Sequence, residues 1–184
     1  MAEPLRDAAL TPYSDTNPLA VRAAPRAITA SFVAVAAGNY ADNDVISNDA
    51  DAGEGDPLAF TNIVRAAGGA AKVIGAALSM SEDGILATSE LFLFSQAPTD
   101  SEMDDNAAWG GVGAADQPYY LGSIAFAALA DVGAISFALP ATLTPAAPLL
   151  VHAVATSLFG VLVFRDAEIN ETAGMTVQVT LYVE

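Results

Sequence analysis

"GMTVQVTLYVE", residues 174–184, has the clearest periodicity in the chain. Apolar side chains alternate there with polar or amphipathic ones: Met175, Val177, Val179, Leu181 and Val183 against Thr176, Gln178, Thr180 and Tyr182. Strict alternation is typical of a β-strand that buries one face and exposes the other. The stretch therefore predicts a terminal strand with its valines in a core.

Similar short apolar segments recur back to residue 28, separated by loops rich in Gly, Pro and Asp. They cover residues 28–34, 58–65, 70–80, 85–95, 119–126, 148–157, 158–165 and 174–184. Many short strands with turn residues between them favour an all-β sandwich, jelly-roll-like, over residues 27–184. The expected core includes Phe32, Phe92, Phe94, Ile124, Val177 and Val179. Alanine-rich stretches at 66–79 and 123–139 would also suit helices by propensity, and this alternative stays open.

The segment "LFLF", Leu91 to Phe94, is apolar on both faces of its expected strand. Such a strand lies centrally in a sandwich, or its outer face meets another subunit. Five acids follow it around the single tryptophan, Trp109. They are Asp100, Glu102, Asp104, Asp105 and Asp116, and we expect them in a solvated loop.

Residues 1–26 carry Pro4, Pro12, Pro18 and Pro25 and no regular period. Prolines at this spacing prevent a continuous helix, so we expect an extended N-terminal arm. Its bases Arg6, Arg22 and Arg26 are balanced by Glu3, Asp7 and Asp15, which leaves the whole net charge of −16 on residues 27–184.

That charge argues against nucleic acid and anionic membranes as partners, because both require a basic surface. The start of the chain lacks the basic and apolar regions of a signal peptide. Residues 146–164 are apolar enough to suggest a membrane helix, but they contain Pro148, His152 and Gly160, and two adjacent strands explain them better. With no cysteine, the chain has no disulfide and no thiolate site.

Little in the sequence indicates catalysis. His152 is the only histidine and occupies a strand position, no G-x-S-x-G or phosphate-binding loop is present, and we expect neither an enzyme nor a cofactor. Paired carboxylates for glycoside hydrolysis are not excluded by residue type. The acidic loop 42–56 departs from the EF-hand spacing, so no metal is expected, although its carboxylates keep calcium as an alternative. Those candidates are Asp42, Asp44, Asp49 and Asp51.

One set of motifs resembles a family of small structural proteins of tailed bacteriophages and prophages. The central motif runs from Leu91–Phe94 through Ala97-Pro98-Thr99 and Asp105-Asn106-Ala107-Ala108-Trp109 to Asp116–Phe126. "AITASF" (27–32), residues 60–79, "LFGVLV" (158–163) and residues 176–184 also look like that family. The resemblance covers most of residues 27–184 but neither the arm nor the loop 49–55.

The resemblance implies a capsid decoration (cement) protein, a jelly roll that sits as a homotrimer on the outer surface of the phage head. Its partners would be the major capsid protein and copies of itself, and it would be a virion component assembled in the host cytoplasm. The family supplies no catalytic residues. We expect Arg6, Arg22 and Arg26 to contact acidic groups of the shell.

A second hypothesis is a head-fibre or tail-associated jelly-roll module that binds host surface glycans. Aromatic side chains are the usual platforms for sugars, and the candidates, which would equally suit an interface, are Trp109, Tyr119 and Tyr120. Packing within a core is the alternative interpretation of the same three residues.

Overall fold

The structure, a computed structural model, describes residues 25–35, 39–49, 55–141, 149–167 and 174–184. Arg6, Arg22 and nearly all of the expected arm lie outside this part of the chain, as does Asp51. No helix of the described residues is long and apolar enough to cross a membrane, and the apolar stretch around 149–164 forms two strands.

The described chain folds into eleven β-strands and one short 3₁₀ turn, Gln117–Tyr119. The strands are β1 (Arg26–Val33), β2 (Val45–Ile46), β3 (Leu58–Phe60), β4 (Ala70–Met80), β5 (Ser89–Phe94), β6 (Tyr120–Phe126), β7 (Ala130–Asp131), β8 (Ser136–Ala141), β9 (Leu149–His152), β10 (Leu158–Phe164) and β11 (Thr176–Val183). The helical alternative for 66–79 and 123–139 is wrong, because those stretches supply turns and the strands β4, β6, β7 and β8. Ala71, Ala76, Ala77 and Ala138 are buried between strands, whereas most of the other alanines in these stretches are exposed.

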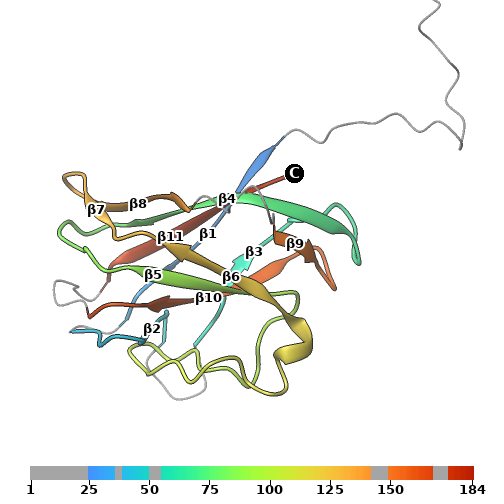
Figure 1. The fold of residues 1–184 in the computed structure, drawn as a ribbon, viewed down its shortest axis with the longest axis horizontal. Coiled ribbons are helices and arrows are strands. Elements are labelled where there is room, and N and C mark those ends of the chain that lie inside the picture. Colours follow the sequence, from blue (N-terminus) through green and yellow to red (C-terminus); the bar gives the residue numbers. More distant parts are fainter. Residues whose placement is uncertain (1–24, 36–38, 50–54, 142–148, 168–173) are drawn as a thin grey trace, which may run out of the picture.

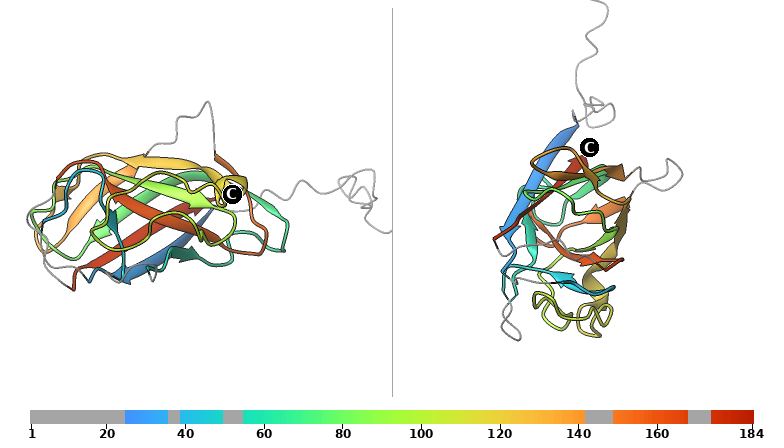
Figure 2. Two further views of the ribbon diagram at one scale, coloured as in Figure 1. Left: turned by 90° about the horizontal axis from the view of Figure 1, so that it is seen from below. Right: turned by 90° about the vertical axis from the view of Figure 1, so that its left-hand side faces the viewer.

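The strands form two antiparallel sheets that pack face to face (Figures 1 and 2). The first sheet has the order β1-β11-β4-β8-β7, with β9 also paired to β4. The second has the order β2-β10-β5-β6, with β3 also paired to β10. From β1 to β11 the chain passes back and forth between the sheets, which is the winding of a jelly roll. The predicted all-β, jelly-roll-like sandwich is confirmed.

The main core fills the space between the two sheets. The alternation at the C-terminus behaves as predicted, since Val177, Val179 and Leu181 of β11 are fully buried there. Ile124 joins the same core, and Phe32 is half-buried against it. The polar residues that alternate with the valines, such as Thr176 and Gln178, face solvent.

Phe92 and Phe94 belong to a different cluster from the one expected. Leu91 and Leu93 of β5 point into the main core, whereas the two phenylalanines pack on the outer face of the second sheet with Val161 and Val163 of β10. A strand can be apolar on both faces only when something covers its outer face. In this chain the cover is the protein's own connection between β5 and β6, not a second subunit.

Two fully buried serines of the sandwich differ in hydrogen bonding. Ser136 Oγ accepts a hydrogen bond from the Ile85 N–H at 3.0 Å, but Ser89 Oγ has no partner among the described residues. A buried hydroxyl without a partner costs stability, because its hydrogen bonds to water are lost and not replaced. We therefore expect Ser89→Ala to raise the free energy of unfolding by about 1 kcal/mol.

The matched control is Ser136→Ala, which removes the acceptor of a buried N–H and should lower the free energy of unfolding by about 1–2 kcal/mol. Urea denaturation followed by the fluorescence of the single tryptophan measures both changes. Destabilisation of equal size by the two substitutions would mean that Ser89 has a partner, such as a bound water.

Candidate functional site

The connection between β5 and β6, residues 95–119, covers the outer face of the second sheet, and we call it the outer loop. Trp109 packs its ring on Phe92 with a centroid distance of 4.7 Å and is only 6% exposed. Met103 and Val112 add further apolar contacts to this cluster. Burial of a large aromatic ring typically stabilises a fold by several kcal/mol, so Trp109 fixes the loop on the sheet.

One end of the outer loop is tied together by the carboxylate of Asp116. Its Oδ1 accepts the N–H of Thr99 at 2.9 Å, and its Oδ2 accepts the N–H groups of Asp100 and Ser101 at 2.9 and 2.7 Å and the Ser101 hydroxyl at 2.7 Å. Gly113 lies against this group of hydrogen bonds, where a Cβ would stand 2.4 Å from the Asp100 carbonyl oxygen. The carboxylate thus replaces the strand partners that an irregular loop lacks.

These contacts shift the titration of Asp116. Burial by itself raises the pKa of a carboxyl group, but the hydrogen bonds from Thr99, Ser101 and Asp100 outweigh burial and lower the pKa of Asp116 below its ordinary value. The ionised form is therefore the one that the folded protein holds.

Asp105 anchors the other end of the outer loop in the same manner. Its carboxylate accepts hydrogen bonds from the Tyr40 hydroxyl at 2.7 Å, the Ser47 N–H at 2.8 Å and the Val35 N–H at 3.1 Å. It is 5% exposed. The expectation of solvated acids is therefore wrong for Asp105 and Asp116, which organise backbone that has no strand neighbour.

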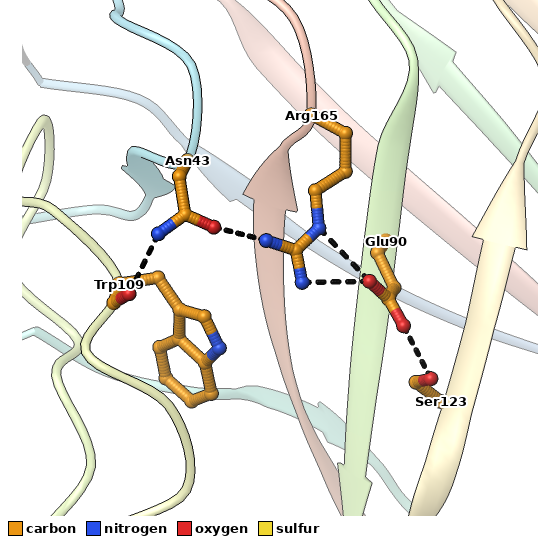
Figure 3. A network of polar contacts seen from close by, with 5 residues as sticks. All are labelled: Asn43, Glu90, Trp109, Ser123 and Arg165. Carbon is orange, nitrogen blue, oxygen red and sulfur yellow. Dashed lines mark hydrogen bonds and ion pairs between the residues drawn. The ribbon is translucent and has the colours of Figure 1, made fainter.

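A polar network crosses the rim of the same surface (Figure 3). Arg165, just after β10, donates two hydrogen bonds to Glu90 Oε2 of β5, at 2.9 and 2.7 Å, and a third to the side-chain oxygen of Asn43. Asn43 in turn donates to the Trp109 carbonyl at 2.7 Å, and the Ser123 hydroxyl contacts the other Glu90 oxygen. The network links β5, β6, β10, the segment before β2 and the outer loop.

The network has a structural role rather than an open binding geometry. The guanidinium of Arg165 lies over the Phe92 ring, 5.3 Å from its centroid, on the same cluster that Trp109 covers. Asn43 adopts a left-handed backbone conformation with φ of 76°, which asparagine tolerates better than most residues. Sequence reasoning missed these residues; the only signal was one acid in an apolar strand, Glu90, and one base after another, Arg165.

Two of the three aromatic candidates, Trp109 and Tyr120, pack on the outer face of the second sheet. Trp109 presents little surface to an external sugar, and Tyr120 is half-buried, with ring centroids 5.7 Å from Phe94 and 6.2 Å from Phe92. Tyr119 is also half-buried, and its carbonyl accepts the Ser95 N–H at 2.8 Å. The three side chains do not form an open aromatic platform.

The calcium candidates do not come together in the described structure. The Asp44 carboxylate accepts the Ala41 N–H at 2.6 Å, Asp42 is exposed, and the Asp49 backbone carbonyl accepts the Asp105 N–H at 2.6 Å. Within the described ranges, no three His, Asp or Glu side chains gather as metal ligands would. Asp51 lies outside these ranges.

Charge is distributed unevenly along the long axis of the sandwich. We call the end where β1 begins the proximal end and the end where β1 finishes the distal end; in Figure 1 the C-terminus marks the proximal side and the β7–β8 hairpin the distal side. The proximal end carries three bases and the single histidine: Arg26, Arg65, Lys72 and His152. The acids Glu184, Asp100 and Asp116 lie on the same side. Arg26 donates to the carbonyls of Asn62 and Ile63, and Lys72 lies 3.9 Å from Glu184.

The distal end is acidic and partly apolar. Its connections carry Asp42, Glu82, Asp83, Asp131 and Asp166. Leu86, Val132 and Ile135 are exposed there as well. Of the bases in the described ranges, Arg165 lies at this end, and Glu90 already neutralises it at 2.7 Å. The two ends therefore present surfaces of different chemistry.

No protein-family model matches the chain, and no curated protein matches it. The resemblance to phage structural proteins thus stays a prediction from motifs. The structure gives those motifs a physical meaning, because Asp105, Trp109 and Asp116 are the residues that fix the outer loop.

The hydrogen bonds to the Asp116 carboxylate predict that the stability of the fold depends on pH. At pH 7 we expect Asp116→Asn to lower the free energy of unfolding by about 2–3 kcal/mol, because an amide has one acceptor oxygen where the carboxylate has two. The folded-state pKa is lowered, so the stabilisation is complete above the unfolded-state pKa and is lost as pH falls through the folded-state value. The difference between wild type and variant should therefore shrink below about pH 4.

Asp100→Asn is the control, since the exposed Asp100 side chain accepts one backbone hydrogen bond, from Ala115 at 3.0 Å. Its effect should be within about 0.5–1 kcal/mol of zero at any pH. Denaturation curves between pH 3 and pH 8 test both variants, and an Asp116→Asn effect that does not change over this range contradicts the interpretation.

Proposed function

We propose that this chain is a decoration (cement) protein of a tailed-bacteriophage head. It binds the outer surface of the capsid and stabilises the contacts between capsid subunits. Two findings support the proposal: the body is the jelly roll that the resemblance implies, and the resembling motifs are the parts that make this body rigid. The mechanism is mechanical and needs no catalytic group.

The observation that carries the proposal is the difference in charge between the two ends of the sandwich. The neutral segment with Arg6 and Arg22 joins the body at the proximal end, where Arg26 and Arg65 are exposed. The connections with Glu82, Asp83, Asp131 and Asp166 lie at the opposite end, while Asp100, Asp116 and Glu184 lie on the proximal side. A molecule built in this way meets an acidic shell best with its proximal end, because the approach of its acidic end costs electrostatic energy.

Stabilisation of a shell follows from repetition. Each copy adds weak contacts to neighbouring capsid subunits, and a symmetric array multiplies them. A rigid cover is required, since a loop that yields transmits no force, and the outer loop is held by two buried carboxylates and a buried tryptophan. The homotrimer that the resemblance implies is part of this proposal.

The glycan-binding alternative has less support. A sugar platform needs an exposed ring face, and Trp109 is buried against Phe92 while Tyr120 packs on Phe94. Paired acids for glycoside hydrolysis have no better support, because Asp105 and Asp116 accept hydrogen bonds from loop backbone.

Charge variants at the two ends test the proposal. We expect Arg6→Gln, Arg22→Gln and Arg65→Gln together to weaken binding to heads of the phage that encodes the chain by about tenfold or more, because they remove the attraction to an acidic shell. Cosedimentation with purified, undecorated heads gives the dissociation constant. Binding by the wild type should weaken as salt is added.

The matched control is Ala127→Glu, Ala128→Glu and Ala134→Glu, which changes the net charge by the same three units at exposed distal positions. It should bind nearly as wild type. Weaker binding by the control alone would reverse the orientation, and a chain that purifies with tails and ignores heads would overturn the proposal.

A further inference from the structure

Strand β1 forms one edge of the first sheet (Figure 2, right). It pairs with β11 from Arg26↔Val183 to Val33↔Thr176, and no other described strand pairs with it. The pairing continues past Val33, where Ala34 donates to the Met175 carbonyl at 2.8 Å and accepts from the Gly174 N–H at 3.0 Å. Antiparallel pairing alternates, so even-numbered residues of β1 face β11. The N–H and C=O groups of residues 27, 29, 31 and 33 therefore point to the open side.

Beyond Pro25 and Arg26 at its start, this edge has none of the usual protection against pairing. Native proteins protect edge strands with charges, prolines, bulges or short length. Residues 27–33 contain no charge and no proline, and the register with β11 has no shift. The other edges differ: β7 and β2 have two residues each, and β6 has a register shift beside Gly122, whose φ is 130°. Strand β1 is the long, regular edge of the described sandwich.

The sequence of β1 is nearly symmetric about Ala30. Reading outward from that residue, Thr29 matches Ser31, Ile28 matches Phe32 and Ala27 matches Val33. Two antiparallel copies centred on Ala30 would therefore place hydroxyl beside hydroxyl and apolar beside apolar, which are favourable cross-strand pairs. This register also sets odd residues opposite odd residues, and these are the ones whose backbone groups are free.

We propose that two copies of this chain pair through β1, antiparallel, with a twofold axis at Ala30. The first sheets of the two copies then form one continuous sheet. The strand termini fit this register, because the next hydrogen-bonded pair would join Val35 to Pro25. Pro25 has no N–H, and the Val35 N–H is already bonded to Asp105 Oδ2 at 3.1 Å. Pairing thus ends where no further groups are free.

Exposure and charge are consistent with a second copy as the occupant. Val33 is 51% exposed, and in this register it lies beside Ala27 of the other copy. Residues 25–29 of that copy run along a shallow groove of about 620 Å³ lined by Ser31, Val35, Asn48 and Gly174, among others. The two Arg26 side chains stand about 27 Å apart, well beyond the Debye length at physiological salt.

The dimer has its own salt dependence, which separates it from binding to a head. Each copy carries −16, so the two bodies repel, and added salt should strengthen the dimer by screening that repulsion. Head binding through bases should weaken under the same change. The inference concerns the free protein and does not depend on the proposed function.

A charge-swap experiment tests this pairing. Residue 31 of one copy faces residue 29 of the other, and the two copies of residue 31 lie close to the axis. We expect Ser31→Lys alone and Thr29→Glu alone to be monomeric, because each places like charges near the axis. An equimolar mixture of the two variants should dimerise again, as should the full chain that carries both substitutions. Light scattering behind a sizing column, up to about 0.5 mM protein, measures the masses.

Gln178→Lys is the matched control, since it adds the same charge on the same sheet face beside Ser31 but one strand in from the edge. It should remain dimeric, like wild type. Denaturation curves establish that each variant is folded, and the mixture distinguishes lost pairing from lost folding. A wild type that is monomeric at every concentration, a trimer that both single variants keep, or a mixture that stays monomeric overturns the inference.

Discussion

The outer face of β5 is apolar and must be covered, and the structure of the second sheet and the outer loop depends on this constraint. Leu91 and Leu93 of this strand fill the main core, which forces Phe92 and Phe94 to the other side. Exposed there, two phenylalanines beside two valines of β10 would form an apolar patch of the kind that promotes association. The outer loop removes this patch, and Trp109 packs directly on Phe92.

Covering a sheet with a loop creates a second problem, because loop backbone groups lose water and have no strand beside them. Each buried N–H without a partner costs on the order of 1–3 kcal/mol, so several together would cancel the gain from burying an indole ring. Asp105 and Asp116 solve this problem as carboxylates, since one side chain accepts three or more hydrogen bonds. The acids around the tryptophan are there to satisfy the loop, and only secondarily to carry charge.

Much of the fold follows from the sequence, because the strands of a sandwich alternate buried apolar residues with exposed polar ones. The alternation at 174–184 and the apolar segment 70–80 predict β11 and β4 almost to their ends. Strands of two residues, such as β2, leave no period to detect. The alanine-rich stretch that becomes β6 to β8 was ambiguous for another reason: alanine has the best helix propensity, and only the partner strands decide its conformation.

The site was less predictable because it depends on register. Glu90 and Arg165 lie 75 residues apart and meet only because β5 and β10 pair with Val163 beside Glu90. An acidic loop likewise has the same composition whether its carboxylates face water or backbone, and the left-handed turns that aim them are absent from any periodicity. Composition predicts that the chain is acidic, but only the fold determines where each carboxylate lies and what it contacts.

The direction of β1 connects the two surfaces that we propose. Because β1 runs from the proximal to the distal end, two copies paired antiparallel point their proximal ends in opposite directions. Such a dimer presents only one proximal end to a shell, so pairing and attachment compete for the same molecules. The acidic distal ends lie far apart in the antiparallel dimer, whereas on a head they all face outward, so their mutual repulsion does not favour the attached state. Attachment therefore depends on the contacts that the proximal end makes with the shell.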